Sequence, residues 1–303
     1  MKKFFMLGFL LILLGITYYQ KENLLDIYND LLYEFTKKEV SLNGVNEYYR
    51  DYDFMYVQNT NNFNPEDKQD ILNIYYTVIN AGKDEFTFYC PSEYKECIND
   101  VNSLANNQTT LSHINNFVHP FNGFKNIETK YDSLGKVTIN IQKSYNETQI
   151  KQILEKVNEI KSEVFNDKLS TLDNIRNVHD YIINHSKYDS ERSDNNIVNY
   201  KSDIAYGPLI ESYGLCGGYT DAMEIFLEEL GIRSFKVSSD NHIWNAVYYN
   251  NSWLHLDLTW DDPVTSNGTD ELEHDFFLIS TDKLKEIEPL EHFFDLDVYQ
   301  EFN

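Results

Sequence analysis

The chain is poor in cysteine, in proline and in positive charge. It has 3 cysteines and 6 prolines among its 303 residues. Its 25 Lys and Arg residues face 49 Asp and Glu residues, so the formal net charge is −24. This charge repels nucleic-acid phosphates, and we therefore expect no nucleic-acid partner. The length allows a sizeable core and one to two domains.

The few cysteines do not form a recognisable metal motif. No Cys-x-x-Cys pair is present, and the spacing of the histidines does not favour a shared ligand set. We therefore predict no metal and no cofactor. Cys90 and Cys97 are close enough for a local disulfide, which leaves Cys216 as the free thiol. Four histidines without thiol partners are expected to be structural: His113, His119, His179 and His185.

The N-terminus has the charged-then-apolar layout of an export signal. Lys2 and Lys3 precede an apolar run from Phe4 to Tyr19, and neither an Ala-x-Ala site nor a lipid-accepting cysteine follows. The pattern predicts an uncleaved signal anchor over residues 1–20, with the catalytic part outside the cell membrane. A cleaved secretory signal is the alternative.

The next part, residues 21–145, is expected to form a small α+β module. Helical spacing covers Asn23 to Lys38 and Pro65 to Asn80, and Glu85 to Cys90 has an extended pattern. A hairpin is predicted from Ile127–Tyr131 and Lys136–Ile141 around the Asp-Ser-Leu-Gly turn.

The remaining residues, 146–303, are assigned to a catalytic domain. Long amphipathic helices are expected over Glu147 to Phe165 and Leu172 to Asn184. A further apolar stripe follows Cys216 and ends before Gly231. Cys216 would then lie in the first turn of a helix, where unpaired N–H groups and the helix dipole favour the thiolate and can hold an oxyanion. Gly217 and Gly218 would leave room for a substrate carbonyl.

Two alternating segments predict a hairpin that bears a base and a carboxylate. The first runs from His242 to Tyr249 and the second from Trp253 to Thr259, with Asn250-Asn251 as the turn. If Tyr249 pairs with Ser252, His242 and Asp257 are diagonal neighbours on one face. Asp257 would then orient the imidazole of His242 beside Cys216.

Other titratable residues in this region have competing explanations. His255 shares a face with Asp257 and is the rival base, although His242 opens its strand and can reach a cleft more easily. Asp261 and Asp262 are explained by a turn that ends at Pro263, so we assign them no chemistry.

Six short blocks between about Ser170 and Ser280 stand in a fixed order. They are Val178-His179-Asp180-Tyr181-Ile182, Tyr188-Asp189, Cys216-Gly217-Gly218-Tyr219, Gly231-Ile232, His242-Ile243-Trp244-Asn245 and Asp257-Leu258-Thr259-Trp260-Asp261-Asp262-Pro263. In this order and spacing the chain resembles the bacterial transglutaminase-like proteins. The family often has Ala where this chain has Ile243.

The resemblance implies an α+β fold with a papain-like core, in which a helix bearing the cysteine packs on an antiparallel sheet bearing the histidine and aspartate. It also implies a Cys-His-Asp triad of Cys216, His242 and Asp257. A second oxyanion donor usually comes from upstream of the cysteine in this family, and Tyr188 and Tyr206 are both candidates here.

These residues predict a thiol-dependent acyl transfer on an amide of a protein or peptide. The thioester would pass its acyl group to an amine, as in a transglutaminase, or to water, as in a protease or deamidase. The alternatives are a noncatalytic cell-surface binding or assembly module that uses the same cleft, and a peptidoglycan peptide amidase. Protein or peptide substrates, including cell-wall-associated ones, are the expected partners, besides the membrane at the N-terminal helix.

Overall fold

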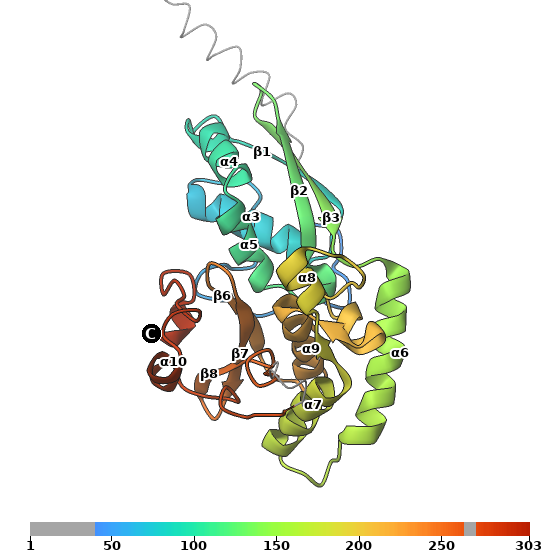
Figure 1. The fold of residues 1–303 in the computed structure, drawn as a ribbon. Helices are drawn as coiled ribbons and strands as arrows, with labels where there is room; N and C mark the ends of the chain where they lie inside the picture. Colours follow the sequence, from blue (N-terminus) through green and yellow to red (C-terminus); the bar gives the residue numbers. More distant parts are fainter. Residues whose placement is uncertain (1–39, 264–270) are drawn as a thin grey trace, which may run out of the picture.

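A computed structural model of the protein describes residues 40–263 and 271–303. Figure 1 shows helices and short sheets in one α+β arrangement, as the sequence predicts; two sheets are antiparallel, and the strands Lys187–Tyr188 and Tyr213–Gly214 form a short parallel pair. The helices are α3 Lys68–Asn80, α4 Cys97–Ala105, α5 Gln108–Asn116, α6 Glu147–Val164, α7 Thr171–His185, α8 Ser190–Asn195, α9 Cys216–Glu229 and α10 Thr281–Ile287. The strands are β1 Glu85–Tyr89, β2 Phe124–Tyr131, β3 Lys136–Lys143, β4 Lys187–Tyr188, β5 Tyr213–Gly214, β6 Ser234–Ser238, β7 Ile243–Tyr249 and β8 Ser252–Leu256. Short helical turns are η1 Pro120–Asn122, η2 Gly207–Glu211 and η3 Gln300–Phe302.

The first sheet confirms the hairpin predicted in the N-terminal part. Its strand order is β1-β3-β2, and β3 pairs antiparallel with both neighbours. Helices α3, α4 and α5 lie beside this sheet (Figure 1). A disulfide joins Cys90 to Cys97, which links the end of β1 to the start of α4 and leaves Cys216 free, as predicted.

The second sheet, β6-β7-β8, carries the other predicted hairpin. Tyr249 pairs with Ser252, so the expected register is confirmed. Asn250 and Asn251 both have positive φ, 49° and 62°, which is the geometry of a tight turn whose twist suits a hairpin. Helix α9 lies against this sheet, and α10 lies at the opposite side with the C-terminal segment (Figure 1). Helix α9 and the C-terminal segment therefore pack on opposite sides of the β6-β7-β8 sheet.

Capping explains where the two long helices begin. Asn146 and Gln149 form a capping box at the start of α6, and Ser170 and Asp173 form another at the start of α7. Each box satisfies backbone N–H groups that would otherwise lack a partner. Both helices thus start within one residue of the positions expected from the sequence.

The buried core extends across the predicted domain boundary at residue 145. One apolar cluster contains Phe54 and Phe117 from the N-terminal part together with Phe235 and Trp244 from the second sheet. A buried ion pair adds to this contact. The guanidinium of Arg50 lies 2.5 Å from the Glu224 carboxylate on α9, and both side chains are inaccessible to solvent. The division into domains at this boundary stays a prediction.

The membrane prediction is wrong for the described residues. Among residues 40–263 and 271–303, no helix has both the length and the apolar character needed to cross a membrane. Helix α6 has 18 residues, but its exposed face carries lysines and glutamates. This finding contradicts the expected membrane-spanning helix as far as the described residues are concerned. The segments expected to form the anchor, residues 1–20, and the helix from Asn23 to Lys38 lie outside the described residues.

Candidate active site

Cys216 is the first residue of α9, as the sequence predicts. Leu215 precedes it in an extended conformation and provides no side-chain cap. Backbone N–H groups in a first helical turn have no intrahelical partner, so those beside Cys216 are available to a negatively charged group. The cysteine is partly exposed. Its thiol is thus accessible at the positive end of a helix.

The two glycines after Cys216 are required by packing against the preceding chain. A Cβ on Gly218 would lie 2.2 Å from the carbonyl oxygen of Ser202, and one on Gly217 would lie 2.8 Å from that of Asp203. The same Ser202 carbonyl accepts a hydrogen bond of 2.7 Å from the Leu215 N–H. The glycines therefore let residues 202–204 pack closely against the start of α9. This explanation differs from the space for a substrate carbonyl that we expected from the sequence.

His242 lies between Cys216 and Asp257. Its Nε2 donates to Oδ2 of Asp257 over 2.5 Å, across the diagonal that the hairpin register predicts. Burial opposes protonation of His242, but the Asp257 carboxylate and a hydrogen bond with the Cys216 thiol outweigh it and raise the pKa of His242 to about 10. A protonated imidazole beside the sulfur favours the thiolate form of a cysteine.

The Asp257 carboxylate is held from several sides. Its Oδ1 accepts hydrogen bonds from the backbone N–H groups of Thr259, at 2.9 Å, and Trp260, at 3.3 Å. Burial would raise the pKa of Asp257, but the hydrogen bonds and charge of His242 and His292 lower it. Asp257 is therefore ionised and fixed in orientation.

His292, which no sequence pattern indicates, contacts the same carboxylate. Its Nε2 donates to Oδ2 of Asp257 over 2.9 Å, and its Nδ1 lies 3.1 Å from the Glu288 carboxylate. The imidazole is fully buried and stacks on Phe276, with the edge of Trp244 against it. His292 follows Asp257 by 35 residues in a segment without regular structure, so neither periodicity nor a motif indicates it.

Both ring nitrogens of His255, the rival base, contact residues outside the Cys216 site. Its Nδ1 accepts a hydrogen bond from the Trp244 indole over 2.9 Å, and its Nε2 lies 3.1 Å from the Thr281 hydroxyl. Burial and the charges of His292 and Lys285 lower the pKa of His255 to about 3, so it is neutral. The geometry therefore favours His242 over His255 as the base.

The structure separates the two candidate oxyanion donors. Tyr188 lies near the sulfur: burial raises the pKa of its phenol, and the charge of Cys216 raises it further. The hydroxyl of Tyr206 instead donates to Gln152 on α6 over 3.1 Å, and Lys201 lies over its ring. The Tyr188 hydroxyl also contacts the Ser193 hydroxyl, at 3.4 Å.

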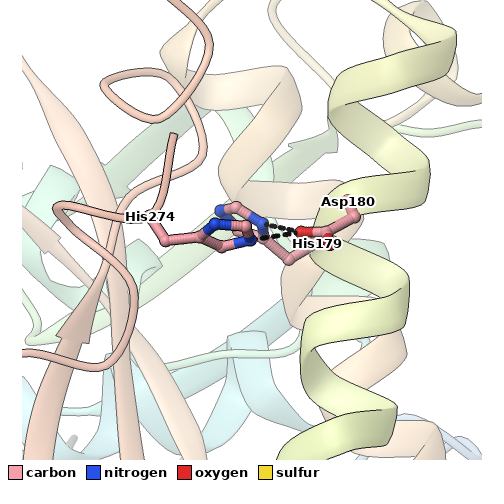
Figure 2. Close-up of side chains that lie close together, drawn as sticks. All are labelled: His179, Asp180 and His274. Carbon is pink, nitrogen blue, oxygen red and sulfur yellow. Dashed lines mark hydrogen bonds and ion pairs between the residues drawn. The ribbon is translucent and has the colours of Figure 1, made fainter. Parts of the chain in front are cut away.

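The remaining residues of the sequence blocks have structural contacts. Asp262 accepts a hydrogen bond of 2.5 Å from the Tyr219 hydroxyl, which ties its loop to α9. Asp261 faces His179 on α7 at 3.1 Å, and His179 also contacts Asp180. Figure 2 shows His179 and Asp180 of this second cluster together with His274, which contacts Asp180.

Part of the chain is similar to a known protein family. The model of the transglutaminase-like superfamily matches residues 158–258, a range that includes Cys216, His242 and Asp257. Residues 158–258 are thus similar to the transglutaminase-like superfamily. The match does not show whether the protein is bacterial, as the resemblance implied.

A solved structure described as the crystal structure of a TGase is similar over 45% of this chain and 44% of its own, with 15% identity and a TM-score of 0.34. The chain thus aligns with less than half of the length of that protein. A search of curated proteins finds no match.

Proposed function

We propose that the protein is a cysteine-dependent acyl-transfer enzyme that acts on an amide of a protein or peptide. The observation that carries the proposal is that His242 contacts both Cys216 and Asp257. A cysteine at a helix start, a protonated imidazole and an oriented carboxylate are together suited to nucleophilic attack on a carbonyl. The family match, by itself, supports cysteine-dependent chemistry of the transglutaminase or protease kind.

The first half-reaction forms a thioester. The Cys216 thiolate adds to the amide carbon, and the carbonyl oxygen becomes negatively charged. The N–H groups at the start of α9 and the Tyr188 hydroxyl are proposed to stabilise that oxygen. The carbon–nitrogen bond then breaks, and His242 gives its proton to the leaving nitrogen. Asp257 keeps the imidazole aligned throughout, because it is held by two backbone N–H groups.

The second half-reaction releases the acyl group. A primary amine or a water molecule attacks the thioester carbon while His242 accepts the proton of the attacking group. The sulfur leaves as the thiolate, which restores the starting state. Whether amine or water attacks depends on how far the occupied cleft excludes water.

His292 is proposed as a positioning residue for this reaction. It shares Oδ2 of Asp257 with His242, so it fixes that oxygen and draws part of its negative charge away from His242. A carboxylate with a second donor attracts the proton of His242 less strongly. His242 can then release its proton to the leaving nitrogen more readily.

The test is an acyl-transfer assay with a glutamine-rich unfolded protein and a primary amine, read by intact mass. An amine adduct that forms with the wild type and not with Cys216→Ala supports transglutaminase chemistry. Mass shifts of deamidation or cleavage fragments with the same dependence mean that water is the acceptor. Equal product from the wild type and Cys216→Ala would contradict the proposal.

A further inference from the structure

Two imidazoles converge on one carboxylate at a place separate from Cys216. His179 Nδ1 lies 2.8 Å from Oδ1 of Asp180, and His274 Nε2 lies 2.7 Å from the same oxygen. The three ligand atoms are all within 4.8 Å of one another. Figure 2 shows His179 and Asp180 extending from α7 and His274 from the facing segment, with the two rings side by side.

A second carboxylate determines which nitrogen of His179 faces this point. Asp261 lies 3.1 Å from Nε2 of His179, and its other oxygen accepts a hydrogen bond of 2.9 Å from the Phe276 N–H. When Nε2 donates its proton to Asp261, the lone pair of Nδ1 points toward Asp180. Either a proton on Nδ1 or a metal ion between the two groups satisfies this contact. Carboxylates that accept from the far nitrogen of a histidine commonly orient metal ligands in this way.

The donor set fits a transition metal better than calcium or magnesium. Two imidazole nitrogens and one carboxylate oxygen, with a fourth position left for water, form a common zinc arrangement, whereas calcium and magnesium prefer oxygen donors. The side chains of Asp180 and His274 are 30% and 36% exposed, so solvent can reach the fourth position.

The distances require only a small adjustment. Ligand bonds of about 2.0–2.2 Å place neighbouring donors roughly 3.3 Å apart in a tetrahedral site. The donors would therefore separate by about half an ångström from their present hydrogen-bonded contacts. Asp180, whose oxygen contacts both rings, is partly exposed and can make this change by side-chain rotation.

The surroundings hold the two rings in place and are acidic, apart from the guanidinium of Arg176, which lies 5.0 Å from the centre of the Phe277 ring. Phe277 packs with its edge or face against both rings, at 5.1 Å from His179 and 5.8 Å from His274, and this limits ring rotation. Glu273 and Asp275 flank His274 in the sequence, and the chain as a whole is strongly acidic. Acidic surroundings raise the local concentration of cations.

We propose that His179, Asp180 and His274 bind a divalent transition-metal ion of the zinc class, with Asp261 as the outer carboxylate that orients His179. Our sequence-based expectation of no metal treated His179 as structural and did not include His274. The bound ion would join the segment 271–277 to α7. Through Asp261, it would also hold the loop that follows Asp257. The proposal does not depend on the acyl-transfer function.

The test is metal binding by the folded protein in a Cys216→Ala background, which removes the free thiol as a competing ligand. The protein is loaded with zinc, dialysed against metal-free buffer and analysed for bound metal. Cobalt loading gives an independent absorption readout of the ligand geometry. We expect one ion per chain and a rise in unfolding temperature with added zinc, because a ligand that binds the folded state stabilises it.

Matched variants locate the ion. His274→Gln and Asp180→Asn change partly exposed side chains. Loss of an outer partner of a metal ligand weakens metal binding by about 10–100-fold, and loss of a ligand itself should weaken zinc binding by at least that much. His185→Gln, on the same helix but hydrogen-bonded to the Tyr181 carbonyl, should bind zinc like the parent. The absence of bound zinc, or equal binding by the parent and His274→Gln, would overturn the proposal.

Discussion

His292 donates a hydrogen bond to the Asp257 oxygen that also faces His242, at 2.9 Å. The imidazole of His292 lies far from the sulfur in sequence, yet it fixes the carboxylate on which the candidate base depends. His292 therefore has a polar contact with the candidate site besides its packing in the core.

Replacement of His292 should change catalysis more than substrate binding. We expect His292→Leu to lower kcat by about tenfold or more with little change in KM, because the lost donor affects the charge that His242 experiences during proton transfer. The part of the pH profile of kcat that depends on the ionisation of His242 should move to higher pH, since Asp257 would then attract the proton of His242 more strongly. His292→Gln keeps an N–H donor and should restore part of kcat. Equal loss in both variants without a shift in pH profile would indicate a purely structural role.

Asp257→Asn tests the orienting carboxylate. The amide is close in size to the carboxylate but removes the negative charge that stabilises the protonated imidazole. By analogy with serine enzymes, kcat should fall by about 10⁴-fold while the fold persists. Circular dichroism and thermal unfolding provide the folding control. A variant that is folded and keeps most of its activity would argue against the role of Asp257.

The raised pKa of His242 predicts a pH-dependent stability. Its pKa rises from the ordinary value of 6.5 to about 10 on folding, so the protonated imidazole stabilises the protein fully below pH 6.5. This contribution decreases as the pH rises from 6.5 and is lost near 10. The stability difference between the wild type and His242→Gln, measured by urea unfolding, should shrink over this range. If the stability difference between the wild type and His242→Gln does not depend on pH, the pKa of His242 does not change on folding.

The buried ion pair between Arg50 and Glu224 predicts that the N-terminal part stabilises α9, the helix that begins at Cys216. Removal of one partner of a buried pair leaves an uncompensated charge and commonly costs about 3–5 kcal/mol. Arg50→Met should therefore lower the free energy of unfolding by an amount of this order. The double variant Arg50→Met with Glu224→Gln removes both charges and should recover part of the loss. Additive losses in urea unfolding would exclude coupling between the two residues.

Local sequence patterns were enough to predict most of the elements that hold the candidate site. The Asn250-Asn251 turn fixed the register of β7 and β8, and alternation then placed His242 diagonal to Asp257. Helices α6 and α7 follow from apolar spacing and N-caps, and α9 follows from apolar spacing and from Gly231, which has a positive φ after its last turn. Helix α4 begins at Cys97, but a helix of 9 residues offers too few turns for a distinct pattern, and the sequence analysis did not predict it.

Residues that meet only through tertiary contacts could not be predicted. His292 and His274 lie in segments without a strand or helix pattern, and each reaches its partner across a large separation in sequence. The sequence also left Tyr188 and Tyr206 as equal candidates for the oxyanion donor, because the surroundings of the two hydroxyls depend on tertiary contacts.

The central claim is that Cys216 is activated by His242, and alkylation of the thiol tests it without a known substrate. The rate of reaction of Cys216 with iodoacetamide is measured at mildly acidic pH by intact mass, in the wild type and in His242→Ala. Since the thiolate is the reactive form, the account predicts that the wild type reacts at least about tenfold faster than His242→Ala. Equal rates in two folded proteins would contradict it.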